Sequence, residues 1–271
     1  MKLLKILLLY WLLSGVLFAQ DISFYQQFIQ PQYDLNKNFK KGCFFKSKEN
    51  QNFREVKRFL KKLYIVHYPY SFYCNCRIIY SKSQNHLIPD PNCGYQKKSK
   101  TTKFMINWEH IMPAYRFGKN LDCWKKRICT REKKGKLIRF KGRKCCSKID
   151  DCFIIMEGDI HNLVPTIYEL NRDRKNYFFG EIPGEKREYG KCNFEVDHNK
   201  NIAEPPEEIR GDIARIYLYM SWFYGIPLNP QEIEFIRKWN KLDPPSDIEK
   251  KLNQLKAMHQ GNENPFITYY R

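Results

Sequence analysis

A carboxylate and an imidazole stand next to each other at Glu109 and His110, directly after the strand-like run 104–108 (FMINW). A second polar motif, residues 159–165 (DIHNLVP), leads through an extended run into a predicted short helix that carries Asn171. Carboxylate and amide oxygens bind hard divalent cations, and a neutral imidazole can accept a proton from water. The pattern therefore predicts metal-assisted hydrolysis of a phosphodiester.

The N-terminal residues 1–19 are typical of an export signal, because Lys2 and Lys5 precede an apolar run from Ile6 to Phe18. An uncleaved membrane anchor is the alternative, since Leu17 is not the small residue expected before a cleavage point. The whole chain has a formal net charge of +19, and loss of the two lysines leaves +17. Such a surplus favours polyanionic partners, namely nucleic acid, anionic lipid or acidic glycan.

All the cysteines follow this predicted signal, and their even number in an exported chain predicts up to five disulfides. A zinc site would need pairs two to four residues apart with matching histidines. The close pairs here are separated by one residue or none, which favours separate bridges and leaves the pairing open. The cysteines are Cys43, Cys74, Cys76, Cys93, Cys123, Cys129, Cys145, Cys146, Cys152 and Cys192.

Hydrophobic periodicity predicts a helix over 55–66 and a strand over 72–80, after a loosely packed N-terminal arm over 20–50. Three helices are predicted near the C-terminus: one over 210–224, one capped by Asn229, and one capped by Ser246. The apolar side chains of the last helix, Ile248, Leu252 and Leu255, are expected to face inward. We interpret the basic stretch 125–144 mainly as a solvated, disulfide-tied surface loop, with Arg143 as the exception.

Several motifs in this order resemble the bacterial secreted endonuclease I family, and the similarity runs from about residue 72 to residue 266. The motifs are 109–114 (EHIMPA), 142–144 (GRK), 156–165 (MEGDIHNLVP), 169–171 (ELN), 203–206 (AEPP), 210–215 (RGDIAR) and 261–266 (GNENPF).

The resemblance implies an α+β fold, a single mixed α/β domain around a ββα-metal (His-Me finger) core, stapled by disulfides and closed by C-terminal helices. This nuclease domain would span 51–271, after the signal and the arm. It also implies a secreted or periplasmic endonuclease that cleaves DNA, and often RNA, without sequence preference and leaves 5′-phosphates. We expect a monomer with no membrane attachment after signal cleavage.

The resemblance also implies roles for individual residues. His110 would be the general base, while Glu109 and Asn171 would bind Mg²⁺, with Mn²⁺ or Ca²⁺ as alternative ions. Arg143 would contact the scissile phosphate, and Glu157 occupies an acidic position that positions water or a neighbouring side chain.

The chain departs from the family pattern in an extra segment between Cys123 and Arg143. Because of it, Arg139 or Arg127 is an alternative to Arg143 at the phosphate. Further contacts to the nucleic-acid backbone are expected from Lys144, Arg174 and Arg215, with Arg172 as another candidate. The motif residues His161 and Asn162 are expected to tie the backbone together or to orient the glutamate.

The alternative class of function is a non-catalytic cationic protein that binds nucleic acid or anionic surfaces. Such a protein would need the charge and the disulfides but would have no use for Glu109, His110 and Asn171 together. A zinc metalloprotease is a weaker option, since the chain lacks the His-Glu-x-x-His motif on a helix.

Overall fold

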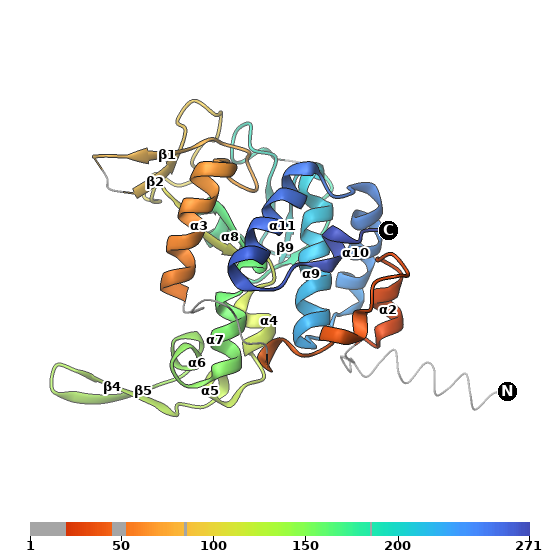
Figure 1. Cartoon of the computed structure of the whole chain (residues 1–271). Coiled ribbons are helices and arrows are strands. Elements are labelled where there is room, and N and C mark those ends of the chain that lie inside the picture. Colours follow the sequence, from red (N-terminus) through yellow and green to blue (C-terminus); the bar gives the residue numbers. More distant parts are fainter. Residues whose placement is uncertain (1–19, 45–52, 84–85, 185) are drawn as a thin grey trace, which may run out of the picture.

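The computed structural model describes residues 20–44, 53–83, 86–184 and 186–271, so the predicted signal lies outside the described residues. Small sheets lie among many helices, with α9, α10 and α11 grouped on one side and the β4–β5 hairpin projecting from the other (Figure 1). This arrangement confirms the predicted α+β class. The elements are, in chain order, α2 (Ile22–Gln26), η1 (Leu35–Asn38), η2 (Gly42–Phe44), α3 (Phe53–His67), β1 (Ile78–Ser81), β2 (His86–Pro89), β3 (Ile106–His110), α4 (Ala114–Gly118), α5 (Asp122–Lys125), β4 (Cys129–Lys133), β5 (Lys136–Phe140), α6 (Arg143–Ile149), α7 (Asp151–Gly158), η3 (Ile160–Asn162), β6 (Leu163–Ile167), α8 (Tyr168–Arg174), β7 (Phe178–Phe179), β8 (Glu195–Asp197), β9 (Ile202–Glu204), η4 (Glu207–Ile209), α9 (Arg210–Tyr224), α10 (Pro230–Leu242), α11 (Asp247–Gln260) and α12 (Pro265–Thr268).

The central unit of the fold is the antiparallel pair of β3 and β6, followed directly by α8. Their register places Glu109 opposite Val164 and His110 opposite Leu163. The remaining sheets are the hairpins β1–β2 and β4–β5 and the three-stranded sheet β7–β9–β8. Because β3 carries the predicted catalytic pair at its end, the strand pair and α8 together decide which side chains can meet that pair.

The N-terminal segment 20–44 is packed into the core, so the prediction of a loosely packed arm is wrong for these residues. Tyr25 and Ile29 are buried, and the Tyr25 hydroxyl lies 2.7 Å from the Ser221 hydroxyl of α9. The Trp222 indole donates a hydrogen bond of 3.0 Å to the Leu35 carbonyl. The apolar side chains of segment 20–44 show no obvious period in the sequence, yet they pack against α9.

The predicted helix over 55–66 is confirmed as α3, whereas the predicted strand over 72–80 is mostly wrong. Only its last residues belong to β1, and the part before it is a turn. Asn75 has a φ of 49°, a left-handed conformation that a strand does not tolerate. The Ser71 hydroxyl accepts a hydrogen bond from the Cys76 amide, which closes the turn locally.

The predicted C-terminal helices are confirmed as α9, α10 and α11, and their caps differ in detail. Asn229 and Glu232 form the full capping box of α10. Ser246 caps α11 by accepting from the Glu249 amide, but the Glu249 carboxylate binds Arg215 of α9 instead of returning to the cap. Glu249 is thus used for a contact between helices, which sequence spacing does not reveal.

The most deeply buried side chains of α11 are polar, although Leu252 and Leu255 do pack inward as predicted. Glu249, Asn253, Lys256 and Gln260 are buried at helical spacing, while Leu252 is only partly buried and packs against the apolar cluster of α3. Polar groups can be buried when they find hydrogen-bond partners. Asn253, for example, accepts a hydrogen bond of 2.9 Å from the Asn264 amide and donates one of 3.1 Å to the Asn264 carbonyl.

Five disulfides pair all the cysteines, as the count predicted. One of them joins β4 of the hairpin to α6, another joins α5 to α6, and two others start from the turn before β1. The bonds are Cys43–Cys152, Cys74–Cys192, Cys76–Cys93, Cys123–Cys146 and Cys129–Cys145.

The two bridges of this turn allow a matched test of disulfide stabilisation. Cys74→Ser with Cys192→Ser opens a separation of 118 residues, and Cys76→Ser with Cys93→Ser opens one of 17. Chain-entropy arguments predict losses of about 5 and about 3 kcal/mol in unfolding free energy, respectively. Denaturant unfolding of both double variants measures the difference, and the reverse order would contradict an entropic origin.

Candidate active site

The strand–strand–helix unit brings the predicted catalytic residues to one place. Glu109 and His110 end β3, and α8 begins immediately after its partner strand β6. The Asn171 amide nitrogen donates to the Trp108 carbonyl over 3.2 Å, which fixes α8 against the end of β3. Because its nitrogen is used in this bond, the Oδ1 atom of Asn171 is the atom suited to binding a cation.

Glu109 is a buried carboxylate held through one of its two oxygens. Its Oε1 accepts hydrogen bonds from Tyr73 Oη at 3.2 Å and from Arg174 Nη1 at 2.9 Å. Burial raises the pKa of Glu109 to about 7, although Arg174 and Tyr73 both act in the opposite direction. A buried carboxylate that is hard to ionise gains most from a nearby cation, so Oε2 is suited to metal binding.

The imidazole of His110 is held in a single orientation by a backbone carbonyl. Its Nε2 atom lies 2.8 Å from the Glu157 carbonyl oxygen, which can only accept a hydrogen bond. Nε2 therefore carries the hydrogen, and Nδ1 keeps the free lone pair. Burial, followed by the charge of Arg143, lowers the pKa of His110 to about 3, so the ring is neutral at physiological pH.

Arg143 and Glu157 form an ion pair beside this imidazole. Arg143 Nε donates to Glu157 Oε1 over 2.5 Å, and Ser147 Oγ donates to Oε2 over 2.7 Å. The Arg143 side chain is 43% exposed, so its terminal nitrogens remain accessible. Glu157 positions the site twice, through its carboxylate on Arg143 and through its backbone carbonyl on His110.

Arg174 and Arg215 do not lie where the sequence analysis expected them. Both side chains are fully buried, which is incompatible with direct contact to a phosphate at the surface. Arg215 pairs with Glu249 and Asp212 at 2.6 and 2.9 Å. Arg174 of α8 and Arg215 of α9 are therefore internal, because buried carboxylates and carbonyls require their charge.

Arg174 holds Glu109 and His110 in place from inside the fold. Its Nη1 donates to Glu109 Oε1 and to the His110 carbonyl, both over 2.9 Å, and its Nη2 donates to the Ile111 carbonyl over 2.7 Å. Its guanidinium also stacks over Phe179 at 4.2 Å from the ring centre. Arg174 thus fixes the glutamate and the backbone at the end of β3.

Of the other residues predicted to contact nucleic acid or the backbone, Lys144 and Arg172 are exposed and Asn162 is internal. Lys144 is exposed next to Arg143 and stays available for a phosphate. Arg172 is 40% exposed and pairs with Asp173 at 2.8 Å. Asn162 ties the backbone together, as expected, by bonding both the amide and the carbonyl of Met112 at 2.7 and 3.0 Å.

Three supporting residues were missed in the sequence. Tyr73 binds Glu109, Ser147 binds Glu157, and the Phe53 ring lies 5.3 Å from that of His110. Tyr73 and Phe53 stand far from the motifs in the chain, where spacing could not detect them. Ser147 carries the best signal, since it lies one helical turn after Arg143 and therefore on the same face of α6.

The donor set fits a hard divalent ion that keeps most of its water ligands. One carboxylate oxygen of Glu109 and the amide oxygen of Asn171 are the protein ligands that this type of ion needs. Among the described residues, no group of three or more His, Cys, Asp or Glu side chains is gathered that would hold a metal by itself.

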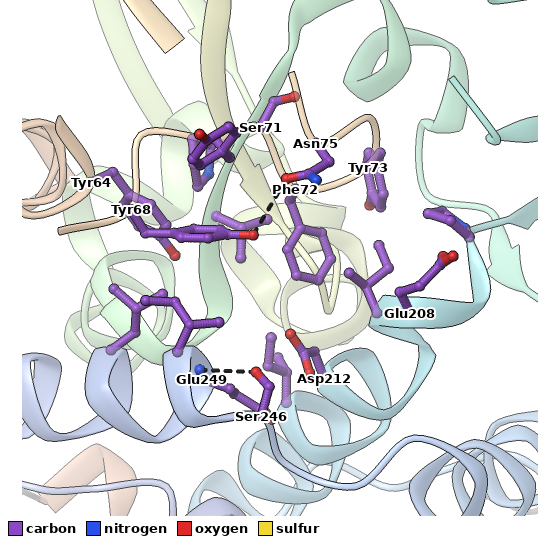
Figure 2. Close-up of a pocket in the computed structure, with 18 of the residues that line it drawn as sticks. Tyr64, Tyr68, Ser71, Phe72, Tyr73, Asn75, Glu208, Asp212, Ser246 and Glu249 are labelled. Atoms are coloured by element: carbon purple, nitrogen blue, oxygen red, sulfur yellow. Dashed lines mark hydrogen bonds between the residues drawn. The ribbon is translucent and has the colours of Figure 1, made fainter. Parts of the chain in front are cut away.

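A separate hollow lies behind the strand pair, between the turn after α3 and the helices α9 and α11 (Figure 2). This cavity of about 490 Å³ is lined by Tyr64, Phe72 and Asp212 among others. Tyr73 lines it as well and connects it to Glu109 through its hydroxyl. Its lining contains neither His110 nor Arg143, so the chemistry predicted here takes place outside it.

These observations define a class of protein: a disulfide-bonded α+β fold with a strand–strand–helix centre that combines a neutral imidazole, a buried carboxylate, an amide and an exposed arginine. The model of the Endonuclease I family matches residues 45–270, and the chain belongs to this family.

Relatives with names that describe location and activity support this assignment. The chain is 40% identical to a periplasmic deoxyribonuclease of Aeromonas hydrophila, over 82% of this chain and 87% of that protein. It is also 40% identical to an extracellular deoxyribonuclease of the same organism, over 80% and 88%. An extracellular ribonuclease of Bacillus amyloliquefaciens is 31% identical over 41% of this chain and 43% of that protein.

The predicted secreted or periplasmic location is confirmed by the first two of these names. Within the described part of the chain, every helix is too short or too polar to span a bilayer.

The role of Arg174 can be tested by comparison with its neighbour Arg172. Arg174→Gln leaves Glu109 and two backbone carbonyls without their cationic partner, which we expect to cost about 3–5 kcal/mol in unfolding free energy. Arg172→Gln removes ion pairs with Asp173 and Glu169 from a half-exposed side chain and should cost about 1 kcal/mol. Denaturant unfolding measures both values, and equal losses would refute the supporting role.

Proposed function

We propose that this protein is an endonuclease that hydrolyses phosphodiester bonds of DNA outside the cytoplasm, without sequence preference. The observation that carries the proposal is the His110 imidazole, neutral and fixed through Nε2, beside the buried carboxylate of Glu109. A surface-binding protein has no need for a buried, oriented base. The deoxyribonuclease names of the relatives support DNA as the substrate.

The reaction requires proton removal from a water molecule aligned with the leaving oxygen. Nδ1 of His110 accepts this proton, while the Glu157 carbonyl holds the ring and disperses the positive charge that it gains. The terminal nitrogens of Arg143 donate to the non-bridging phosphate oxygens, whose negative charge grows as the water attacks. Cleavage of the bond between phosphorus and the 3′-oxygen then leaves a 5′-phosphate on one product.

Glu109 and Asn171 would hold the divalent cation, for which Mg²⁺ is our first choice and Mn²⁺ or Ca²⁺ are alternatives. A bound ion would supply positive charge to the phosphate and to the leaving oxygen. The ligand set asks only for a hard ion with oxygen ligands, so this choice follows the chemistry of the donors.

The lack of sequence preference follows from the type of contact. Arg143 and Lys144 carry exposed charges suited to phosphates, which have no sequence information. RNA shares the same phosphodiester, and the ribonuclease relative covers part of the chain, so RNA is a second expected substrate. We propose that a monomer is sufficient, because every residue with a role belongs to one chain.

Replacing His110 separates an enzyme from a cationic binding protein. Oxidised protein should degrade plasmid DNA with Mg²⁺, and His110→Ala should lower the cleavage rate about 10²- to 10⁴-fold, since the general base is lost. DNA binding should persist in the variant. The matched control is His67→Ala at the C-terminal end of α3, which should keep the wild-type rate.

Two outcomes would contradict this assignment. Wild-type cleavage by His110→Ala would mean that another group accepts the proton. Binding without cleavage by the wild-type protein, with Mg²⁺, Mn²⁺ and Ca²⁺ each tried, would leave the cationic binding protein as the better explanation.

The cation can be tested without measuring activity. Mg²⁺ that binds only the folded protein should raise its melting temperature, and the rise should continue with the logarithm of the Mg²⁺ concentration above the Kd. Glu109→Gln should weaken Mg²⁺ by about tenfold or more, because it removes the only charged ligand. A melting temperature that rises equally with Mg²⁺ in both proteins would place the ion elsewhere, and EDTA should abolish cleavage by the wild-type protein.

A further inference from the structure

The extra segment between Cys123 and Arg143 is exposed and tied by a disulfide, as predicted, but it forms a projecting β-hairpin and not an irregular loop (Figure 1). β4 and β5 pair over five residues each and are joined at Lys134 and Gly135. These two residues have φ values of 52° and 70°, the left-handed pair typical of a tight type I′ hairpin turn. The segment therefore has a defined shape and can present side chains in a fixed order.

The net positive charge of the two hairpin strands lies on one of their faces. Side chains of neighbouring cross-strand pairs alternate between the two faces of an antiparallel ribbon. The pair of Lys133 with Lys136 and the pair of Arg131 with Ile138 therefore share one face. The opposite face carries Glu132, the only acidic residue of the two strands, and Arg139, so the charges of that face cancel.

The basic face contains a repulsive contact that the described residues do not compensate. Lys133 and Lys136 stand directly opposite each other, and like charges in that arrangement destabilise a ribbon. No carboxylate of the described residues forms an ion pair with Arg131, Lys133 or Lys136. All three are exposed, so an external polyanion is free to approach them.

The hairpin is anchored next to the proposed phosphate-binding arginine. Cys129 belongs to the basic face and is bonded to Cys145 of α6, two residues after Arg143. A second bond joins Cys123 to Cys146, and the Gly142 amide donates to the Cys123 carbonyl over 2.9 Å. The basic face is thus fixed relative to Arg143, and little conformational entropy remains to be lost on binding.

We propose that the face formed by Arg131, Lys133 and Lys136 binds the phosphate backbone of duplex DNA beyond the scissile bond. This inference rests on the proposed function and deepens it, because it extends the substrate contact outward from the catalytic centre. Five residues of strand span about 17 Å. Because each DNA strand carries one phosphate about every 3.4 Å, the hairpin would contact phosphates up to about five base pairs from the scissile bond.

Binding measured in EDTA tests the proposal without any cleavage. The test variant combines Arg131→Gln, Lys133→Gln and Lys136→Gln. The matched control removes the same charge from exposed positions of α10 and α11, with Lys241→Gln, Lys250→Gln and Lys251→Gln. The affinity of each protein for a fluorescent duplex of about 30 base pairs is measured between about 50 and 200 mM salt, the range over which counterion release is large.

Three lost phosphate contacts should reduce the slope of log affinity against log salt by about 2.7. Between the lowest and highest salt, the affinity of the wild-type protein should fall by a factor about 40 times larger than that of the hairpin variant. The control variant should keep the wild-type slope. Equal slopes for both variants would overturn the proposal, as would a hairpin variant that loses binding to anionic vesicles and retains its binding to duplex DNA.

Cleavage of duplexes of different length gives the second readout. The loss of cleavage rate in the hairpin variant should be large on a duplex of about 30 base pairs. It should be smaller on a duplex of about six base pairs, which barely reaches the hairpin. The same deficit at both lengths would indicate damage to the catalytic centre and would refute the inference. If the wild-type protein cuts no DNA, the proposed function fails, while the EDTA binding comparison still decides the role of the hairpin.

Discussion

The buried guanidinium of Arg174 makes the contacts on which the end of β3, with Glu109 and His110, depends. It lies inside the fold, where it bonds the Glu109 carboxylate and the carbonyls of His110 and Ile111 while stacking on Phe179. Without this partner, ionisation of the buried Glu109 carboxylate would be strongly disfavoured. The two carbonyls lie at the end of β3, where few strand-to-strand hydrogen bonds remain, so they also need a donor. One side chain of α8 therefore stabilises the Glu109 carboxylate, holds the backbone of His110 and fixes the helix that carries Asn171.

A second layer of buried polar contacts joins this centre to the C-terminal helices. Asp159 accepts hydrogen bonds from the hydroxyls of Tyr219 and Tyr224, both over 2.7 Å, and from the His161 amide. Asn162, three residues later, holds the backbone at Met112. In the sequence, the polar residues of the motif 159–165 resemble catalytic residues. In the structure they hold β6 and the end of β3 in position relative to α9. The polar face of α11 belongs to the same buried network, since Gln260 accepts from the Ile160 amide.

The positive charge of the chain is consequently used in two different ways. Arg174 and Arg215 are internal and neutralise buried carboxylates, so they add nothing to a surface that attracts nucleic acid. Arg143, Lys144 and the basic face of the β4–β5 hairpin are exposed and lie along one continuous segment fixed by disulfides. Because export favours disulfide formation, the same condition that oxidises the cysteines also fixes the basic segment beside the imidazole.

The sequence alone determined the features that depend on neighbours in the chain. These are the helices with their caps, the strand that ends in Glu109 and His110, the even set of cysteines and the family motifs. Tertiary structure decided everything that depends on which distant segments meet. It placed Arg174 and Arg215 inside, turned the polar face of α11 inward, made a turn of the expected strand before β1, and paired the cysteines. The reason is physical: the charge, polarity and period of a residue set what it can bond, but burial and the partner on another segment decide whether it does.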